Sequence, residues 1–252
     1  DANNSNRSAT NYINTMFADP IVKSAIDVVA THTYADPNHN TNWNALKTAA
    51  SSKPVWVTES ANLKSEDISM LDAANYIKWM LRGFNEGGMT AYMMHLFYEE
   101  EDDNGYSSLV VWKPNGEIIL PKRYHTFKHF TNLIKKGYKV IKTENAQDGV
   151  MVGAFISPNE DEIVLQVFNE GTSQDFTLQI PEGTIAINHY ITSDDSTQNF
   201  TLQNDVSFTT EDDFISVNVN ALSLNTFVYE IDKTQLKIDE NLASKLLQKY
   251  GN

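Results

Sequence analysis

Hydrophobic residues in the first half of the chain alternate between a helical spacing and short continuous runs. The helical segments carry apolar residues every three or four positions, and the third of them stops at Gly87-Gly88, a pair typical of a helix end. The intervening runs are rich in β-branched residues, which favours buried strands. The predicted helices span residues 8–18, 42–51, 71–86 and 121–137, and the predicted strands span residues 26–32, 55–59 and 89–95. Strands separated by helices predict parallel βαβ units and an α/β fold.

The pattern changes after Gly137, where short runs of alternating apolar and polar residues follow one another. Turn sequences such as Pro181-Glu182-Gly183 separate these runs. Eight strands at this spacing predict an antiparallel β-sandwich. The predicted strands span residues 139–143, 150–156, 163–168, 175–180, 184–191, 207–209, 214–219 and 226–231.

The change of pattern divides the chain of 252 residues into three parts. We expect an α/β domain over residues 1–136, a β-sandwich over residues 137–232 and a charged tail over residues 233–252 whose leucines suit a short amphipathic helix. Hydrophobic residues make up 41% of the chain, which is ample for a core. The N-terminus has neither an initiator Met nor a basic-then-apolar signal segment, so we expect a chain that was processed or that begins within a larger protein.

Charge and cysteine content exclude several classes of function. Lys and Arg number 19 against 33 Asp and Glu, which gives a net charge of −14 and makes nucleic acid and membrane surfaces poor partners. The chain has no cysteine, so thiol nucleophiles, disulfide scaffolds and Cys-zinc sites are excluded. No apolar run approaches the ~18–20 residues that a membrane helix needs.

Polar groups gather where the three predicted parallel strands end. His32 and Tyr34 close the first strand, Glu59 closes the second, and His95 and Tyr98 follow the third. In a (β/α) barrel the carboxyl ends of the strands form the active-site face, so functional groups are expected at these positions.

Strand alternation makes this expectation more specific. Within residues 55–59, a period of two places Glu59 on the same face as the two valines. The same period places His32 with Tyr34 and places His95 on the matching face of its strand. If these faces point into a barrel, the four side chains converge on one mouth.

A carboxylate among imidazole and phenol groups suits cleavage of a glycosidic bond. An ionised Glu59 would attack or stabilise an oxocarbenium-like centre, and a Tyr hydroxyl would hold it in position. From spacing alone an alternative stays open, in which Glu59 satisfies backbone donors at a helix N-terminus.

Several segments together resemble glycoside hydrolase family 30. The most specific of them is the Trp-x-Thr-Glu motif at residues 56–59, in register with the two neighbouring strands. The resemblance covers roughly residues 1–231, as strands six to eight of the family's barrel, its last helix and its side β-domain. The segments that carry it are residues 31–34, 55–60, 87–92, 124–138 and 221–227.

The resemblance implies the C-terminal part of a (β/α)8 barrel followed by an antiparallel β-sandwich domain. It implies a secreted retaining glycosidase of the endo-xylanase type, without a cofactor, in which Glu59 is the nucleophile. It also implies that Tyr34 hydrogen-bonds Glu59, that His32 lines the sugar subsite, and that the substrate is a β-linked polysaccharide or oligosaccharide, most often xylan. His95 and Tyr98, which follow the third strand, are further candidate substrate-binding residues.

The chain departs from the family in two side-chain features. His95 stands where relatives usually have a Trp as sugar platform. The acidic run at residues 99–103 stands where relatives specific for glucuronate-decorated xylan have an Arg/Tyr cluster. Five carboxylates repel another, so glucuronate recognition is not expected.

A further departure is the number of barrel strands. Only three precede the sandwich, whereas a full barrel has eight. The family's acid/base Glu follows an Asn at the end of strand four, which would lie before Asp1. Asn85-Glu86 and Asn169-Glu170 reproduce the dipeptide, but at a helix end and in a sandwich turn. We therefore expect a partner, either the missing N-terminal half of the barrel or a second copy of the chain. The alternative is a non-catalytic carbohydrate-binding fragment.

The remaining candidates favour ordinary structural roles. The acidic run lacks the alternating ligands and turn glycine of a calcium loop and is predicted to be a solvated loop. His125 and His129 are four residues apart on a predicted helix, but their aromatic neighbours favour packing over metal binding. No metal site is therefore predicted. Trp112 and Tyr106 are candidate stacking surfaces for sugar rings, although Trp112 could equally pack against the linker.

Overall fold

The computed structural model describes most of the chain, which divides into two compact units, Asp1–Tyr124 and His125–Asn252. The domain boundary expected from the sequence, between residues 136 and 137, lies further along the chain and stays a prediction. The tail beyond residue 235 and its expected helix lie outside the described residues. The described residues are 9–34, 42–62, 66–101, 107–143, 147–209 and 211–235.

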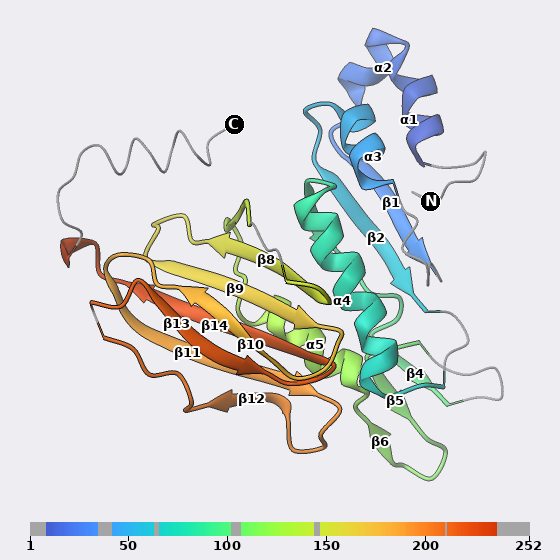
Figure 1. Cartoon of the computed structure of the whole chain (residues 1–252). Helices are drawn as coiled ribbons and strands as arrows, with labels where there is room; N and C mark the ends of the chain where they lie inside the picture. The colour runs from blue at the N-terminus through green and yellow to red at the C-terminus, as the bar shows by residue number, and fades with distance from the viewer. Residues whose placement is uncertain are drawn as a thin grey trace. The chain divides into compact units, whose positions relative to one another are not determined.

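The first unit is built on a parallel sheet, as the alternation of helices and strands predicts. Its strand order in the described residues is β1-β2-β3, and both pairings are parallel. The short helix α2 was not expected from the sequence, and α1 and α2 precede the first strand (Figure 1). The elements are α1 (Ala9–Phe17), α2 (Pro20–Ala25), β1 (Val29–Tyr34), α3 (Trp43–Ala50), β2 (Val55–Ala61), α4 (Met70–Asn85) and β3 (Met89–Tyr92).

One face of this sheet is buried under helices. Strand residues Val29, Val55 and Val57 join Trp43 of α3 and Ile13 of α1 in one hydrophobic core. Asn42 begins α3 by accepting a hydrogen bond from the Ala45 amide through Oδ1 at 3.0 Å. These side chains identify the helix-facing side of the strands.

The glycine that follows α4 is required by close packing. A Cβ atom at Gly87 would lie 2.5 Å from the Trp43 ring and 2.8 Å from the Gly83 carbonyl oxygen. Glycine therefore lets the chain turn from α4 into β3 directly against the buried indole.

In the described residues, no helix is both long and apolar enough to cross a membrane.

A small sheet that the sequence pattern did not predict follows β3. Its order in the described residues is β4-β5-β6, with β4 and β5 parallel and β5 and β6 antiparallel. Each strand has two or three residues, too few for a period of two to show. The strands are β4 (Tyr98–Glu100), β5 (Val110–Trp112) and β6 (Ile118–Ile119).

A buried ion pair joins the start of α4 to the start of α5 (Lys122–Thr131). Arg123 Nη1 lies 2.8 Å from Asp72 Oδ2, and both side chains are 1% exposed. Arg123 Nε also donates to the Ser108 carbonyl at 2.6 Å, and Asn62 Nδ2 donates to Asp72 Oδ1 at 2.8 Å. Burial raises the pKa of Asp72, while the Arg123 charge opposes this rise. The pair therefore links four separate segments of the unit.

The second unit is the antiparallel sandwich that the sequence predicts. Its described strands form a six-stranded sheet, ordered β12-β11-β14-β9-β8-β7, and a two-stranded sheet of β10 and β13 (Figure 1). Phe176 and Leu178 of β10 and Val219 of β13 share one core with Val167 and Phe227 of the larger sheet. The strands are β7 (Lys139–Ile141), β8 (Val150–Ile156), β9 (Glu162–Asn169), β10 (Gln174–Gln179), β11 (Thr184–Ser193), β12 (Asn199–Gln203), β13 (Phe214–Val219) and β14 (Ser223–Ile231).

Two expectations for this unit were wrong. Residues 207–209 are not a strand: Phe208 packs against the core, and the Thr209 amide donates to Asp212 Oδ2 at 2.6 Å in a local turn. The eighth strand is instead β12, whose polar composition hid it. The helix expected to reach residue 137 ends at Thr131.

We predict that Asp72→Ala lowers the free energy of unfolding of the first unit by about 3–5 kcal/mol, because the buried guanidinium of Arg123 loses the carboxylate that compensates its charge. All four tryptophans lie within residues 1–124, so urea denaturation followed by tryptophan fluorescence reports on this unit. The control is Glu117→Ala, which removes the exposed partner of Lys113 and should cost less than about 1 kcal/mol. Equal losses in the two variants would contradict the assignment.

Candidate functional site

The candidate site forms where β1 and β2 end, and a one-residue register shift shapes it. Thr31 pairs with Val57, but the next residue, His32, pairs with Glu59. Thr58 is the extra residue, so Glu59 points to the side opposite Val57. The expectation that Glu59 shares a face with the valines was wrong, because the extra residue Thr58 interrupts the alternation. The shift turns Glu59 to the side of His32 and Tyr34.

Glu59 is held by the two aromatic side chains of β1. The Tyr34 hydroxyl donates a hydrogen bond to Glu59 Oε2, and His32 Nδ1 lies 3.6 Å from the same oxygen. The Glu59 side chain remains 40% exposed, so it is partly open to solvent. The rings of His32 and Tyr34 meet edge to face, with centroids 5.5 Å apart.

His95 completes the group from the third strand. Strand β3 ends at Tyr92, earlier than predicted, but the pairing with β2 continues through the Met93 amide to the Val57 carbonyl and the His95 amide to the Ser60 carbonyl, both at 2.9 Å. The His95 and Tyr34 rings lie 6.2 Å apart between centroids. The structure thus brings together four of the five residues singled out from the sequence: His32, Tyr34, Glu59 and His95.

The surroundings of Glu59 favour its ionised form. The hydrogen bond from Tyr34 is the largest influence and holds the pKa of Glu59 below its ordinary value of 4.5, while partial desolvation opposes it. The charges of His32 and His95 lower the pKa of Glu59 further. Burial, and then the hydrogen bond to Glu59 and its negative charge, raise the pKa of Tyr34, so Tyr34 stays a donor. The pair is therefore a carboxylate and a neutral phenol at neutral pH.

The alternative role of Glu59 as a helix N-terminal carboxylate does not match these contacts. Glu59 lies inside β2, and the N-cap of the following helix α4 is Ser69, whose Oγ accepts from the Leu71 amide at 3.1 Å. The partners of Glu59 are the side chains of Tyr34 and His32, so its contacts favour a role in the group at the strand ends.

A second set of polar residues lies on the opposite, helix-facing side of the same strand ends. Thr33 Oγ1 donates to Ser60 Oγ at 2.9 Å, and the Ser60 and Tyr92 hydroxyls are hydrogen-bonded. Thr33 and Ser60 are buried. These three residues were not singled out from the sequence, although a polar position on a helix-facing strand side was a usable signal.

Two other predicted sugar contacts, Tyr98 and Trp112, do not join the Glu59 group in the described part of the chain. Tyr98 opens β4 with 68% of its surface exposed, and Trp112 ends β5 with 48% exposed. Glu100 pairs with Trp112 across the two strands. The third candidate, Tyr106, and the acidic residues Asp102 and Asp103 lie outside the described residues.

Neither histidine of the predicted helical pair is placed as a metal ligand with the other. His129 is buried, and its Nδ1 and Nε2 form hydrogen bonds with Thr226 at 2.8 Å and Thr192 at 2.9 Å. Burial lowers the pKa of His129 to about 3, so it is a neutral core residue. Among the described residues, no group of three acidic, His or Cys side chains is arranged to hold a metal ion.

The two Asn-Glu dipeptides lie where the sequence places them, at a helix end and in a sandwich turn. Glu86 follows the last residue of α4 and pairs with Arg82 at 2.9 Å. Asn169 ends β9, and its Nδ2 donates to the carbonyls of Thr172 and Asn220. Neither dipeptide lies at the end of a strand of the parallel sheet.

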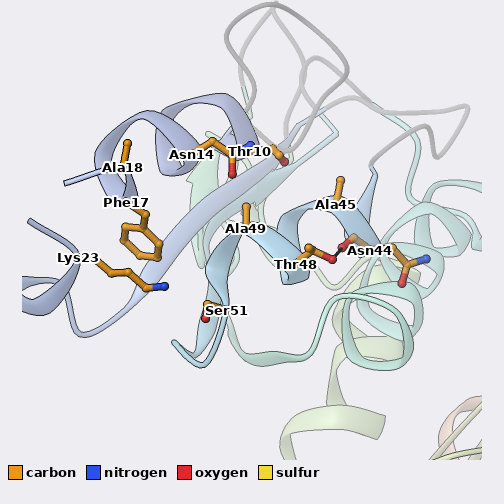
Figure 2. Close-up of a pocket in the computed structure, with 10 residues that line it drawn as sticks. All are labelled: Thr10, Asn14, Phe17, Ala18, Lys23, Asn44, Ala45, Thr48, Ala49 and Ser51. Carbon is orange, nitrogen blue, oxygen red and sulfur yellow. Dashed lines mark hydrogen bonds between the residues drawn. The ribbon is translucent and has the colours of Figure 1, made fainter. Parts of the chain in front are cut away.

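A large surface cavity of the first unit is separate from the Glu59 group. It has a volume of about 710 Å³ and lies among α1, α2 and α3, with Phe17, Lys23 and Thr48 in its wall (Figure 2). Thr48 Oγ1 donates to the Asn44 carbonyl at 2.8 Å. Its lining includes none of the residues singled out from the sequence.

Comparison with solved structures shows the fold. A family 30 endoxylanase from Clostridium papyrosolvens C71 is 20% identical with a TM-score of 0.67, covering 87% of this chain and 53% of that chain. The catalytic domain of xylanase C of family 30 from Talaromyces cellulolyticus is 15% identical with a TM-score of 0.70, covering 89% and 50%. A family 44 xyloglucanase from Paenibacillus polymyxa is 13% identical with a TM-score of 0.59, covering 90% and 52%.

These likenesses confirm the predicted resemblance to family 30 at the level of the fold. The chain spans about half the length of the solved structures that it matches. No family model and no curated protein sequence matches it.

We predict that Tyr34→Phe raises the pKa of Glu59 toward its ordinary value, because the substitution removes the hydrogen bond that stabilises the carboxylate. Carboxyl-carbon NMR of the titrating chain measures this pKa directly. The matched control is Tyr138→Phe, which removes a phenol that donates to Glu162 in the second unit and should leave Glu59 unchanged. An unchanged Glu59 pKa in Tyr34→Phe would contradict the described contact.

Proposed function

We propose that the chain carries the nucleophile of a retaining glycoside hydrolase that cleaves β-linked polysaccharide at internal linkages, with xylan as substrate. The observation that supports this most directly is Glu59, an ionised and partly exposed carboxylate held at a strand mouth by Tyr34 and flanked by His32. A glycosidase nucleophile needs a carboxylate that is ionised, fixed in orientation and open on one oxygen.

In the proposed first step, the free carboxylate oxygen of Glu59 forms a bond to the anomeric carbon as the bond to the leaving oxygen breaks. Tyr34 holds Oε2 through its hydroxyl, which leaves Oε1 for the attack. His32 and His95 line the sugar subsite beside the carboxylate. Water then hydrolyses the glycosyl-enzyme intermediate and releases the sugar with retained configuration.

The leaving oxygen also needs a proton, which a second carboxyl group about 5–5.5 Å from the nucleophile supplies in retaining enzymes. Within the described residues, the hydrogen bonds and ion pairs of Glu59 involve Tyr34 and His32 and no second carboxyl group. We propose that this group belongs to further βα units that complete a (β/α)8 barrel with β1, β2 and β3.

Strand β1 offers the place where such a unit would dock. It pairs with β2 on one edge, and its other edge has no strand partner in the described residues. Beside it lies a groove of about 300 Å³, lined by Tyr12 and Met16 of α1 and by Val28 and Ala30. Parallel sheets are buried on both faces in proteins. In a right-handed βαβ crossover, the helix that precedes a strand packs over the groove between that strand and the adjacent strand of the sheet. The proposed occupant is a parallel strand with its own helix, in the same polypeptide or in a separate one.

Xylan is the proposed substrate because the two family 30 neighbours described above are xylanases. The carboxylates of Glu99, Glu100 and Glu101 support an undecorated chain over one that carries glucuronate. We propose that the enzyme acts outside the cell, where such polysaccharides occur.

We predict that the chain reacts with dinitrophenyl β-xylobioside, whose leaving group departs without a proton and so bypasses the second carboxyl group. Intact-protein mass spectrometry should show one xylobiosyl adduct, mapped to Glu59, with release of dinitrophenolate. Glu59→Gln should abolish both signals, and the rate should fall only at pH values below the ordinary carboxyl pKa of 4.5, because the lowered pKa keeps Glu59 ionised.

The control for this reaction is Glu86→Gln, which alters a carboxylate at the end of α4 and should leave the adduct unchanged. Absence of the adduct, or an adduct that survives Glu59→Gln, would contradict the proposal. Binding to insoluble xylan without an adduct would favour the non-catalytic carbohydrate-binding alternative.

This chain matches about half of the C. papyrosolvens endoxylanase. We predict that the other half of that enzyme binds this chain in a one-to-one complex, which calorimetry can measure. Met16→Glu, in the groove beside β1, should weaken this binding at least about tenfold, because a buried carboxylate is costly. Ile21→Glu is the control, since Ile21 is exposed on α2 outside the groove lining. Absence of binding, equal effects of the two variants, or self-association with the same dependence on Met16 would each contradict this occupant.

A further inference from the structure

The hydroxyl groups of Thr33, Ser60 and Tyr92 form a hydrogen-bonded network that connects all three parallel strands. Thr33 lies on β1 and pairs in register with Ser60 of β2, and its Oγ1 donates to Ser60 Oγ at 2.9 Å. The Ser60 hydroxyl is bonded in turn to the hydroxyl of Tyr92, the last residue of β3. Burial raises the pKa of Tyr92, so it remains a protonated phenol in this network.

This network lies directly behind Glu59. Ser60 follows Glu59 in β2, and adjacent residues of a strand point to opposite sides. The Ser60 side chain is fully buried on the helix-facing side, whereas Glu59 faces Tyr34 on the other side. The Ser60 carbonyl also accepts the His95 amide at 2.9 Å. Ser60 therefore contacts the strand segments that carry His32, Tyr34 and His95.

The register shift makes such an anchor necessary. If Thr58 paired regularly with His32 and the strand had no shift, the strand period would place Glu59 on the helix-facing side with Val57 and Ser60 on the side of His32 and Tyr34. An apolar residue at position 60 would pack on either side of the sheet and would leave the two registers closer in free energy. The hydroxyl partners of Ser60 in the described residues, Thr33 and Tyr92, lie on the helix-facing side.

We propose that Ser60 is a positioning residue, whose hydroxyl, bonded to Thr33 and Tyr92, maintains the register shift that turns Glu59 toward Tyr34. This inference deepens the proposed function and rests on it for the role of Glu59 as nucleophile. Ser60 itself touches no substrate. It acts through the backbone of β2, and Thr33 and Tyr92 act as its anchors on the neighbouring strands.

The test compares two buried serines of the same unit. Ser60→Ala removes the anchor, and Ser108→Ala removes an equally buried hydroxyl that donates to the Val110 carbonyl at 2.8 Å. The pKa of Glu59, measured by carboxyl-carbon NMR, should rise toward its ordinary value in Ser60→Ala as the contact with Tyr34 loosens. It should stay at the wild-type value in Ser108→Ala. The rate of dinitrophenolate release should fall at least about tenfold in Ser60→Ala alone.

A second matched pair keeps the test decisive if Ser60→Ala does not fold. Thr33→Val removes a hydroxyl of the network, whereas Thr31→Val alters a buried threonine on the same side of β1 outside it. Only Thr33→Val should raise the Glu59 pKa. Loss of stability with an unmoved Glu59 pKa in Ser60→Ala or Thr33→Val would assign the network a purely structural role and overturn the inference. A pKa that responds in a chain that forms no adduct would instead refute the proposed function and leave the positioning role standing.

Discussion

The register shift between β1 and β2 is the constraint on which the candidate site depends. Up to Val57 the two strands pair residue for residue, and their valines are buried under α1 and α3. One extra residue then exchanges the two sides of β2, so that a carboxylate leaves the core side and a serine enters it. The valines can therefore pack under the helices while Glu59 lies beside Tyr34 only because the strand is irregular.

The parts of the fold predicted from sequence are those with long, regular patterns. The apolar face of α4 and the alternating runs of β8 and β13 identify their elements closely. The elements that were missed are the short strands β4 to β6, whose pairing depends on neighbours far along the chain, and β12, a polar edge strand. In such strands tertiary pairing decides the structure, and local preference does not.

The sequence predicted which residues form the candidate site, but it did not predict their arrangement. His32, Tyr34, Glu59 and His95 were identified because each lies at the end of a strand, and they do converge. The expectation that placed Glu59 with Val55 and Val57 was wrong, because a period of two cannot reveal an inserted residue. The pairing of Asp72 with Arg123, residues far apart in sequence, was equally invisible to local patterns.

This chain has a fold similar to that of family 30 xylanases. Near the end of strand β2 it carries Glu59, a carboxylate that is ionised, held in orientation and partly exposed to solvent. The measurement that tests its proposed role most directly is a crystal structure of the chain after reaction with an activated, fluorinated xylobioside that hydrolyses slowly. We predict a covalent bond from the sugar to Oε1 of Glu59, with Tyr34 still on Oε2 and Ser60 on the helix-facing side. A Glu59 side chain that points toward α1 and α3, or a sugar attached to another residue, would contradict this role.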